Sequence, residues 1–147
     1  MDKKLLLKTF NNHFIELLDD IILIFPEDKE ISTFSIALNS INKMNPKLSM
    51  KIFYEHIIKG YFKEIDDGDI NFFINKDYYK DLHGISNSDI ILKKIEYLRE
   101  PVKQMSKSNQ ENFMKYIQNL KKLCLLYETC WYSLSKNQMS KIYVIIK

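Results

Sequence analysis

Apolar residues recur every three or four positions through most of the chain, which is the period of an amphipathic α-helix. The first stripe comprises Leu7, Phe10, Phe14, Leu17, Ile21 and Phe25. Pro26 follows directly and predicts the end of this helix, because proline lacks the amide hydrogen that the next turn needs. A second stripe comprises Ile31, Phe34, Leu38, Ile41 and Met44, and Asp28 is placed to cap its first turn.

The middle of the chain predicts shorter helices separated by turn residues. Asn45 and Pro46 indicate a cap followed by proline at the first position of a third helix, and Gly60 is expected to kink that helix. An Asp-Gly-Asp run at 67–69 is expected to end the next helical run and to cap a short fourth helix. Residues 75–88 keep no regular period and predict a long loop.

The clearest helical pattern lies in the C-terminal half. A fifth helix is expected to begin at Ser86 or Ser88, with Pro101 either kinking it or starting a new turn. Ser108 and Glu111 have the spacing of a capping box at the start of another helix. The apolar stripe of that helix comprises Phe113, Ile117, Leu120, Cys124, Tyr127 and Trp131. These residues are expected to belong to the core.

The pattern predicts one all-α domain over residues 1–131 and a C-terminal extension over 132–147. The extension ends in β-branched and aromatic residues at 141–147, so it is expected to be strand-like or docked on a partner. The expected architecture is a single compact bundle of five to seven helices. The arrangement of these helices as three hairpins stays open, with a closed bundle preferred over a short solenoid.

Composition disfavours both disorder and membrane insertion. Hydrophobic residues make up 46% of the chain, too much for a polypeptide that stays unfolded. The longest uncharged apolar run, at 21–26, is far shorter than a membrane span. Cys124 and Cys130 lie on one expected helix with a rise of about 9 Å between them, which exceeds the Cα separation of a disulfide. The sequence therefore predicts a soluble, intracellular protein with reduced cysteines.

Charge is divided unevenly between the two halves. Residues 1–73 carry nine lysines and twelve acidic residues, a net −3, whereas residues 74–147 carry a net +6. An acidic partner would therefore meet the C-terminal half first. Candidate phosphate contacts on the expected solvent face are Lys103, Lys107, Lys115, Lys121 and Lys122. Arg99 is the sole arginine, which weakens the case for fork-like phosphate or base recognition.

No motif for catalysis, metal binding or cofactor binding stands out. The three histidines fall in separate segments, and the glycines at 60, 68 and 84 form no phosphate-binding loop. The expected loop carries an aromatic pair, Tyr78 and Tyr79, beside Lys76 and Asp77. An apolar centre with a charged rim is typical of a protein-binding surface. The alternative is that one tyrosine plugs the core while the other is merely exposed.

Four blocks of sequence are similar to the recurring blocks of an uncharacterised small helical protein family of giant nucleocytoplasmic large DNA viruses: 45–47, 68–73 with 76–78, 99–106, and 114–120 followed by Leu123. The resemblance covers roughly residues 10–127. It implies a viral protein in the host cytoplasm, the virus factory or the virion, and it brings no catalytic residues.

The functional hypothesis is a non-enzymatic helical interaction protein, an adaptor or minor assembly component, that binds a viral or host protein. No cofactor, metal or membrane is expected. One alternative is a nucleic-acid-associated component of viral transcription or translation machinery that uses the basic C-terminal half. Another is a viral mimic that binds a host signalling protein.

Overall fold

The structure is a computed structural model that describes residues 2–75 and 88–131. These residues form seven α-helices and one π-helical turn, with no strand among them. The elements are α1 (Lys3–Ile24), α2 (Lys29–Met44), α3 (Leu48–Phe53), the π turn η1 (Tyr54–Ile58), α4 (Phe62–Asp66), α5 (Ile70–Asn75), α6 (Ser88–Gln104) and α7 (Lys107–Trp131). The prediction of an all-α bundle is confirmed. The expected strand-like tail lies outside the described residues.

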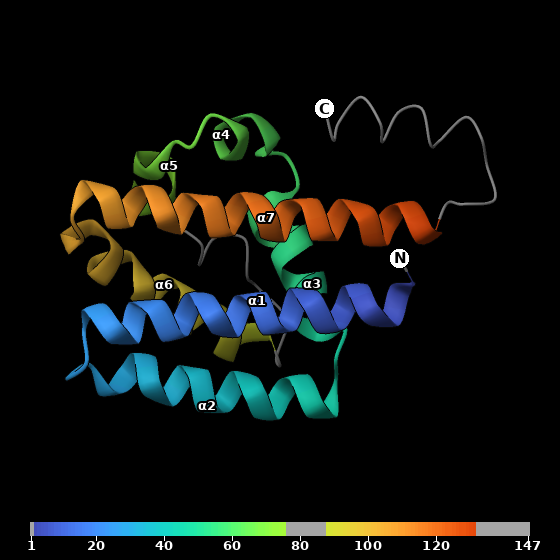
Figure 1. Ribbon diagram of the computed structural model, residues 1–147, viewed down its shortest axis with the longest axis horizontal. Helices are drawn as coiled ribbons and strands as arrows, with labels where there is room; N and C mark the ends of the chain where they lie inside the picture. The colour runs from blue at the N-terminus through green and yellow to red at the C-terminus, as the bar shows by residue number, and fades with distance from the viewer. Residues whose placement is uncertain (1, 76–87, 132–147) are drawn as a thin grey trace.

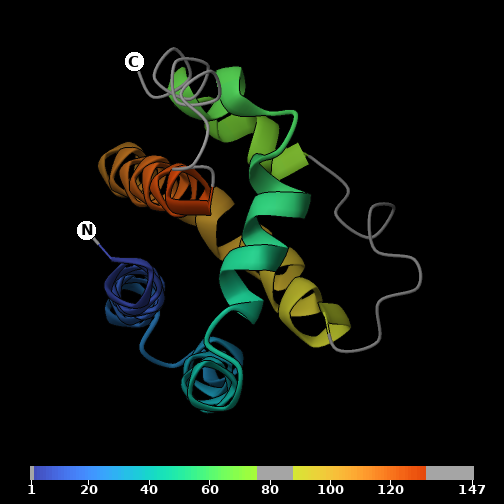
Figure 2. The same ribbon diagram turned by 90° about the vertical axis from the view of Figure 1, so that its right-hand side faces the viewer.

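The two longest helices, α1 and α7, lie side by side and antiparallel, and they make the most extensive interhelical contact (Figure 1). α2 returns antiparallel along the other side of α1. Seen end-on, α3 crosses these long helices, while α4 and α5 lie on the side of α7 away from α2 (Figure 2). The first and last described helices therefore close the bundle against each other, as the closed-bundle prediction requires.

The core is built where these helices face one another. Phe14 is central, because its ring packs edge-on against Phe34 of α2 at 6.2 Å and Phe53 of α3 at 5.9 Å between centroids. The predicted stripe of α7 is buried from Ile117 through Leu120 and Cys124 to Tyr127, while Phe113 is half-buried at its edge. The prediction that this stripe is core is confirmed for these residues.

Several helix ends follow the chemistry that the sequence indicated. The Asp28 carboxylate accepts hydrogen bonds from the first backbone amides of α2, including that of Ile31 at 3.3 Å, and so caps the helix. Asp69 accepts from the amide of Phe72 at 3.2 Å and caps α5, directly after Gly68, whose φ of +69° suits glycine. Both predicted caps are confirmed.

Two predicted helix starts were wrong. Asn45 is the C-cap of α2 and not the N-cap of the next helix, because its amide donates to the carbonyl of Ile41 at 2.7 Å. Its own carbonyl accepts from the amide of Leu48 at 3.2 Å and makes a turn. The third helix begins only at Leu48. Ser106, and not Ser108, caps α7, since its Oγ accepts from the amide of Asn109 at 3.2 Å. α6 continues through Pro101.

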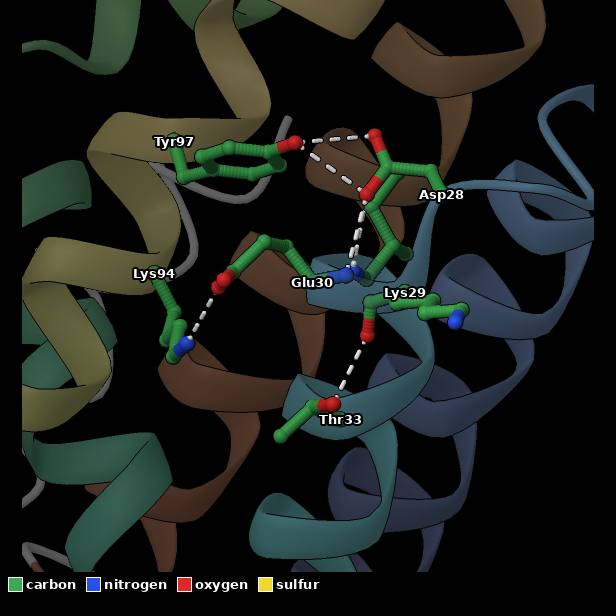
Figure 3. Close-up of polar contacts among 7 residues, drawn as sticks. Asp28, Lys29, Glu30, Thr33, Lys94 and Tyr97 are labelled. Carbon is green, nitrogen blue, oxygen red and sulfur yellow. Dashed lines mark hydrogen bonds and ion pairs between the residues drawn. The ribbon is translucent and has the colours of Figure 1, made fainter.

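The start of α2 is tied to α6 by polar contacts (Figure 3). The Tyr97 hydroxyl donates to both carboxylate oxygens of Asp28, at 3.1 and 3.0 Å, and the pKa of Tyr97 is raised by this hydrogen bond. Lys94 Nζ lies 2.8 Å from Glu30 Oε2. Exposed pairs of this kind contribute little stability, so we interpret them as contacts that align α6 on α2.

Candidate anion-binding groove

A groove of about 710 Å³ lies between the first half of α1 and the last turns of α2, where the chain turns into α3. Both helix ends lie at the end of the molecule where the N-terminus is marked (Figure 1). Its polar lining residues are Lys3, Lys4, Lys8, Lys43, Lys47, Asn11, Asn12, Asn39, Asn42 and Asn45. No acidic side chain lies among the described residues that line it. We call this site the lysine–asparagine groove.

The groove follows from helical spacing on two neighbouring helices. Residues four apart lie one above the other on a helix, so Lys4, Lys8 and Asn12 share one face of α1. α2 brings its last turns alongside, and the turn after Met44 closes the end of the groove. Lys4, Lys8 and Lys43 are exposed, so their charges reach solvent without a carboxylate in the lining to neutralise them.

Two asparagine amides of the groove are held in defined orientations. Ser49, which is buried, donates through Oγ to Asn42 Oδ1 at 2.9 Å, so the amide NH₂ of Asn42 remains as a donor for the groove. Asn11 donates through Nδ2 to the carbonyl of Pro46 at 3.0 Å. Its Oδ1 is buried and has no hydrogen-bond partner among the described residues. The Asn42 amide is therefore a donor of fixed orientation in the groove lining, whereas Asn11 Oδ1 is covered by the protein.

A second hollow of about 320 Å³ adjoins the groove and shares Leu7, Lys47 and Tyr127 with it. We call it the side hollow. Its remaining lining residues are Met50, Lys51, Tyr54, Glu55, Cys124 and Glu128. It differs from the groove in carrying two carboxylates beside apolar and aromatic side chains. Desolvation raises the pKa of Glu128, the nearby charge of Lys3 lowers it, and the nearby charge of Glu55 raises it.

Cys124 lies at the base of the side hollow but has the wrong properties for a nucleophile. Its side chain is buried in the core, and this burial raises the pKa of the thiol well above its ordinary value. A reactive cysteine needs a lowered pKa, since the thiolate is the attacking species. The sequence-based interpretation of Cys124 as a buried core residue is confirmed.

A separate polar cluster joins α1 to α7. The Tyr116 hydroxyl donates a short hydrogen bond to the Asp20 carboxylate. The ring of His13 lies against that of Tyr116, with centroids 4.7 Å apart, and His13 Nδ1 is 3.4 Å from Glu16. The hydrogen bond to Asp20 raises the pKa of Tyr116 to about 12, with desolvation adding to it. Such a tyrosine stays protonated near neutral pH and cannot act there as a base.

We expect Tyr116→Phe to lower the free energy of unfolding at pH 7 by about 1 kcal/mol, because it removes a hydrogen bond to a charged acceptor at a partly exposed site. The folded-state pKa of about 12 exceeds the ordinary 10.0, so this contribution is complete below pH 10 and lost as the pH rises toward 12. Urea denaturation at several pH values measures it. A difference between the two proteins that stays constant up to pH 12 would contradict this assignment.

The candidate phosphate contacts predicted on the C-terminal half do not line the groove. Lys103, Lys107, Lys115 and Lys122 are exposed, on α6 and α7. Placing Lys121 on the solvent face was wrong, because its side chain is 4% exposed and its Nζ lies 2.5 Å from Asp66 Oδ1. The short helix α4 packs on this part of α7 and buries Lys121. The sequence pattern of α7 alone cannot predict this burial.

The predicted protein-binding patch of Lys76, Asp77, Tyr78 and Tyr79 lies outside the described residues, so it stays a prediction. Within the described ranges, no cluster of three or more histidine, cysteine, aspartate or glutamate side chains is placed to hold a metal ion. None of the described helices combines the length and apolarity needed to cross a membrane.

Comparisons of the chain with models of protein families, with curated proteins and with solved structures find no match. The resemblance to a giant-virus family therefore stays a prediction.

The sequence analysis missed the groove, although its signal is present. Three lysines in the first eight residues and a run of amides and lysines at 39–47 are visible in the sequence. An abundance of lysine and asparagine is also what an A/T-rich coding sequence produces, and the N-terminal half is acidic on balance. Only the pairing of α1 with α2 brings these two segments together.

Proposed function

We propose that this protein is a non-enzymatic binding module that holds single-stranded nucleic acid by its phosphates in the lysine–asparagine groove. The observation that carries the proposal is the composition of the groove, with five lysines, five asparagines and no described acidic side chain. Neutralising phosphates with lysine releases condensed counterions, which drives binding without regard to sequence.

The shape of the groove favours a single strand over a duplex. Proteins that read a double helix usually insert a helix or ribbon into one of its grooves. Here the concave surface belongs to the protein, and positively charged protein grooves that follow a backbone are typical of single-strand binding. Lysines act as point charges and do not form the fork-like pairs of arginine, so they suit loose tracking of phosphates.

Fluorescence anisotropy with a labelled mixed-sequence single strand tests the proposal. The logarithm of the binding constant should fall linearly with the logarithm of salt concentration, by about −0.7 for each lysine that contacts a phosphate. We expect Lys4→Glu with Lys8→Glu to weaken binding at least about tenfold and to make this slope shallower by about 1.4, because two contacts are lost. Circular dichroism checks that the variant remains folded.

The matched control is Lys115→Glu with Lys122→Glu, which changes net charge by the same amount at two exposed residues of α7 outside the groove. It should change the affinity by less than about threefold. Equal losses in both variants would mean that overall charge, and not the groove, governs binding. Loss only in the α7 variant would favour the basic C-terminal half. If polyglutamate displaces the labelled strand as well as an unlabelled oligonucleotide does, nucleic acid is overturned as the partner and acidic protein segments are favoured.

A further inference from the structure

We propose that the side hollow receives a base that carries an exocyclic amine, namely adenine, cytosine or guanine, while the phosphates of the same strand lie on the lysines of the groove. This inference rests on the proposed function and deepens it. The groove accounts for affinity, and the side hollow adds a preference among bases.

The groove and the side hollow are continuous. They share three lining residues, Leu7, Lys47 and Tyr127, so one extended ligand can occupy both. Lys3 Nζ lies 5.2 Å from the centroid of the Tyr127 ring, which puts a positive charge at the boundary between them. A nucleotide has the matching arrangement, with its phosphate on one side of the sugar and its base on the other.

Part of the lining of the side hollow is apolar and aromatic. Leu7, Met50 and Tyr127 are buried apolar residues of its wall, and Tyr54 is half-buried, so Tyr54 is the aromatic side chain on which a base can stack. Tyr54 is held there by the π turn, in which its carbonyl accepts from the amide of Lys59 at 2.8 Å, five residues later. π turns occur disproportionately at functional sites.

Two carboxylates also line the side hollow. Glu55 comes from the π turn and Glu128 from α7, and they are close enough for the charge of Glu55 to act on Glu128. An ionised carboxylate is an acceptor only, so the pair suits a group that offers two N–H donors, while Lys47 and Lys51 of the same lining add positive charge. Cytosine, adenine and guanine present an amine to such an acceptor, whereas thymine and uracil have carbonyls and a ring N–H and no exocyclic amine.

The experiment compares labelled oligo-dC with oligo-dT of equal length at one salt concentration, by anisotropy with the full chain. Wild-type protein should bind oligo-dC at least about fivefold more tightly, the lower end of what one good side-chain-to-base pairing provides. Glu55→Gln with Glu128→Gln should reduce the preference to within about twofold, because the paired acceptors are lost. The salt slope should not become shallower, since all groove lysines remain.

The matched control is Glu100→Gln with Glu111→Gln, which removes the same charge at two exposed residues away from the side hollow and should keep the preference for oligo-dC. If Glu55→Gln with Glu128→Gln fails to fold, the preference for oligo-dC is measured with Glu55→Gln alone, because Glu55 is exposed. Equal binding of oligo-dC and oligo-dT by wild type overturns this inference and leaves the proposed function standing. If wild type binds neither oligo-dC nor oligo-dT, this inference and the proposed function are both overturned. Both are also overturned if a lysine-containing phosphopeptide displaces labelled oligo-dC more strongly than unlabelled oligo-dC does.

Discussion

Phe10→Ala should lower the free energy of unfolding by about 3–5 kcal/mol, the range for a fully buried phenylalanine whose removal leaves a cavity. Phe10 is 0% exposed, and its ring centroid lies 5.7 Å from that of Phe53 and 6.3 Å from that of Phe14. It therefore joins α1 to the crossing helix α3. Urea denaturation followed by circular dichroism measures the effect.

Leu23→Ala on the same helix is the control, because Leu23 is 79% exposed and its truncation should change stability by no more than about 0.5 kcal/mol. A loss below about 1 kcal/mol for Phe10→Ala would contradict the packing, since it would mean that the site collapses or that α1 is not held against α3.

Asp66→Ala should destabilise the protein more than Lys121→Met does, although Asp66 is the more exposed partner. The Lys121 side chain is 4% exposed and that of Asp66 is 58% exposed, so only the lysine depends on its partner for compensation. Lys121 Nζ also lies 5.0 Å from the centroid of the Phe62 ring. Removing Asp66 leaves a buried charge without its carboxylate, for which we expect a loss of about 1–3 kcal/mol after allowing for solvent near Asp66.

Lys121→Met keeps most of the aliphatic stem and leaves Asp66 to water, so its cost should stay below about 1 kcal/mol. Denaturation of both single variants and of the double variant gives the coupling energy between the two residues. The reverse order, with Lys121→Met the more damaging, would show that the ion pair itself stabilises the fold.

Periodicity predicted the fold because the long helices bury one face each. The α7 stripe and the buried face of α1 follow directly from three- and four-residue spacing. Helix starts were less predictable where two candidate caps lie close together, as with Ser106 and Ser108, because the choice depends on backbone geometry that the pattern does not contain. Lys121 was misplaced because a short helix from elsewhere in the chain covers it.

The groove was beyond sequence analysis for a related reason. Its two walls are separated by about thirty residues of chain, and neither wall carries a motif by itself. Lys8 and Lys43 become neighbours in one lining only after α1 pairs with α2. The side hollow needs a third element, since Glu55 and Glu128 come from opposite halves of the chain.

The π turn also constrains how the length of this chain can change. A π turn holds one residue more than the α-helical ladder needs, and deleting one residue there would restore the ladder. The helical positions beyond the deletion, up to Ile58, would then rotate by about 100° about the helix axis. This rotation would turn the buried side chains of Ile57 and Ile58 away from the core. The exposed residue Glu55 should therefore accept substitution far more readily than the turn accepts insertion or deletion.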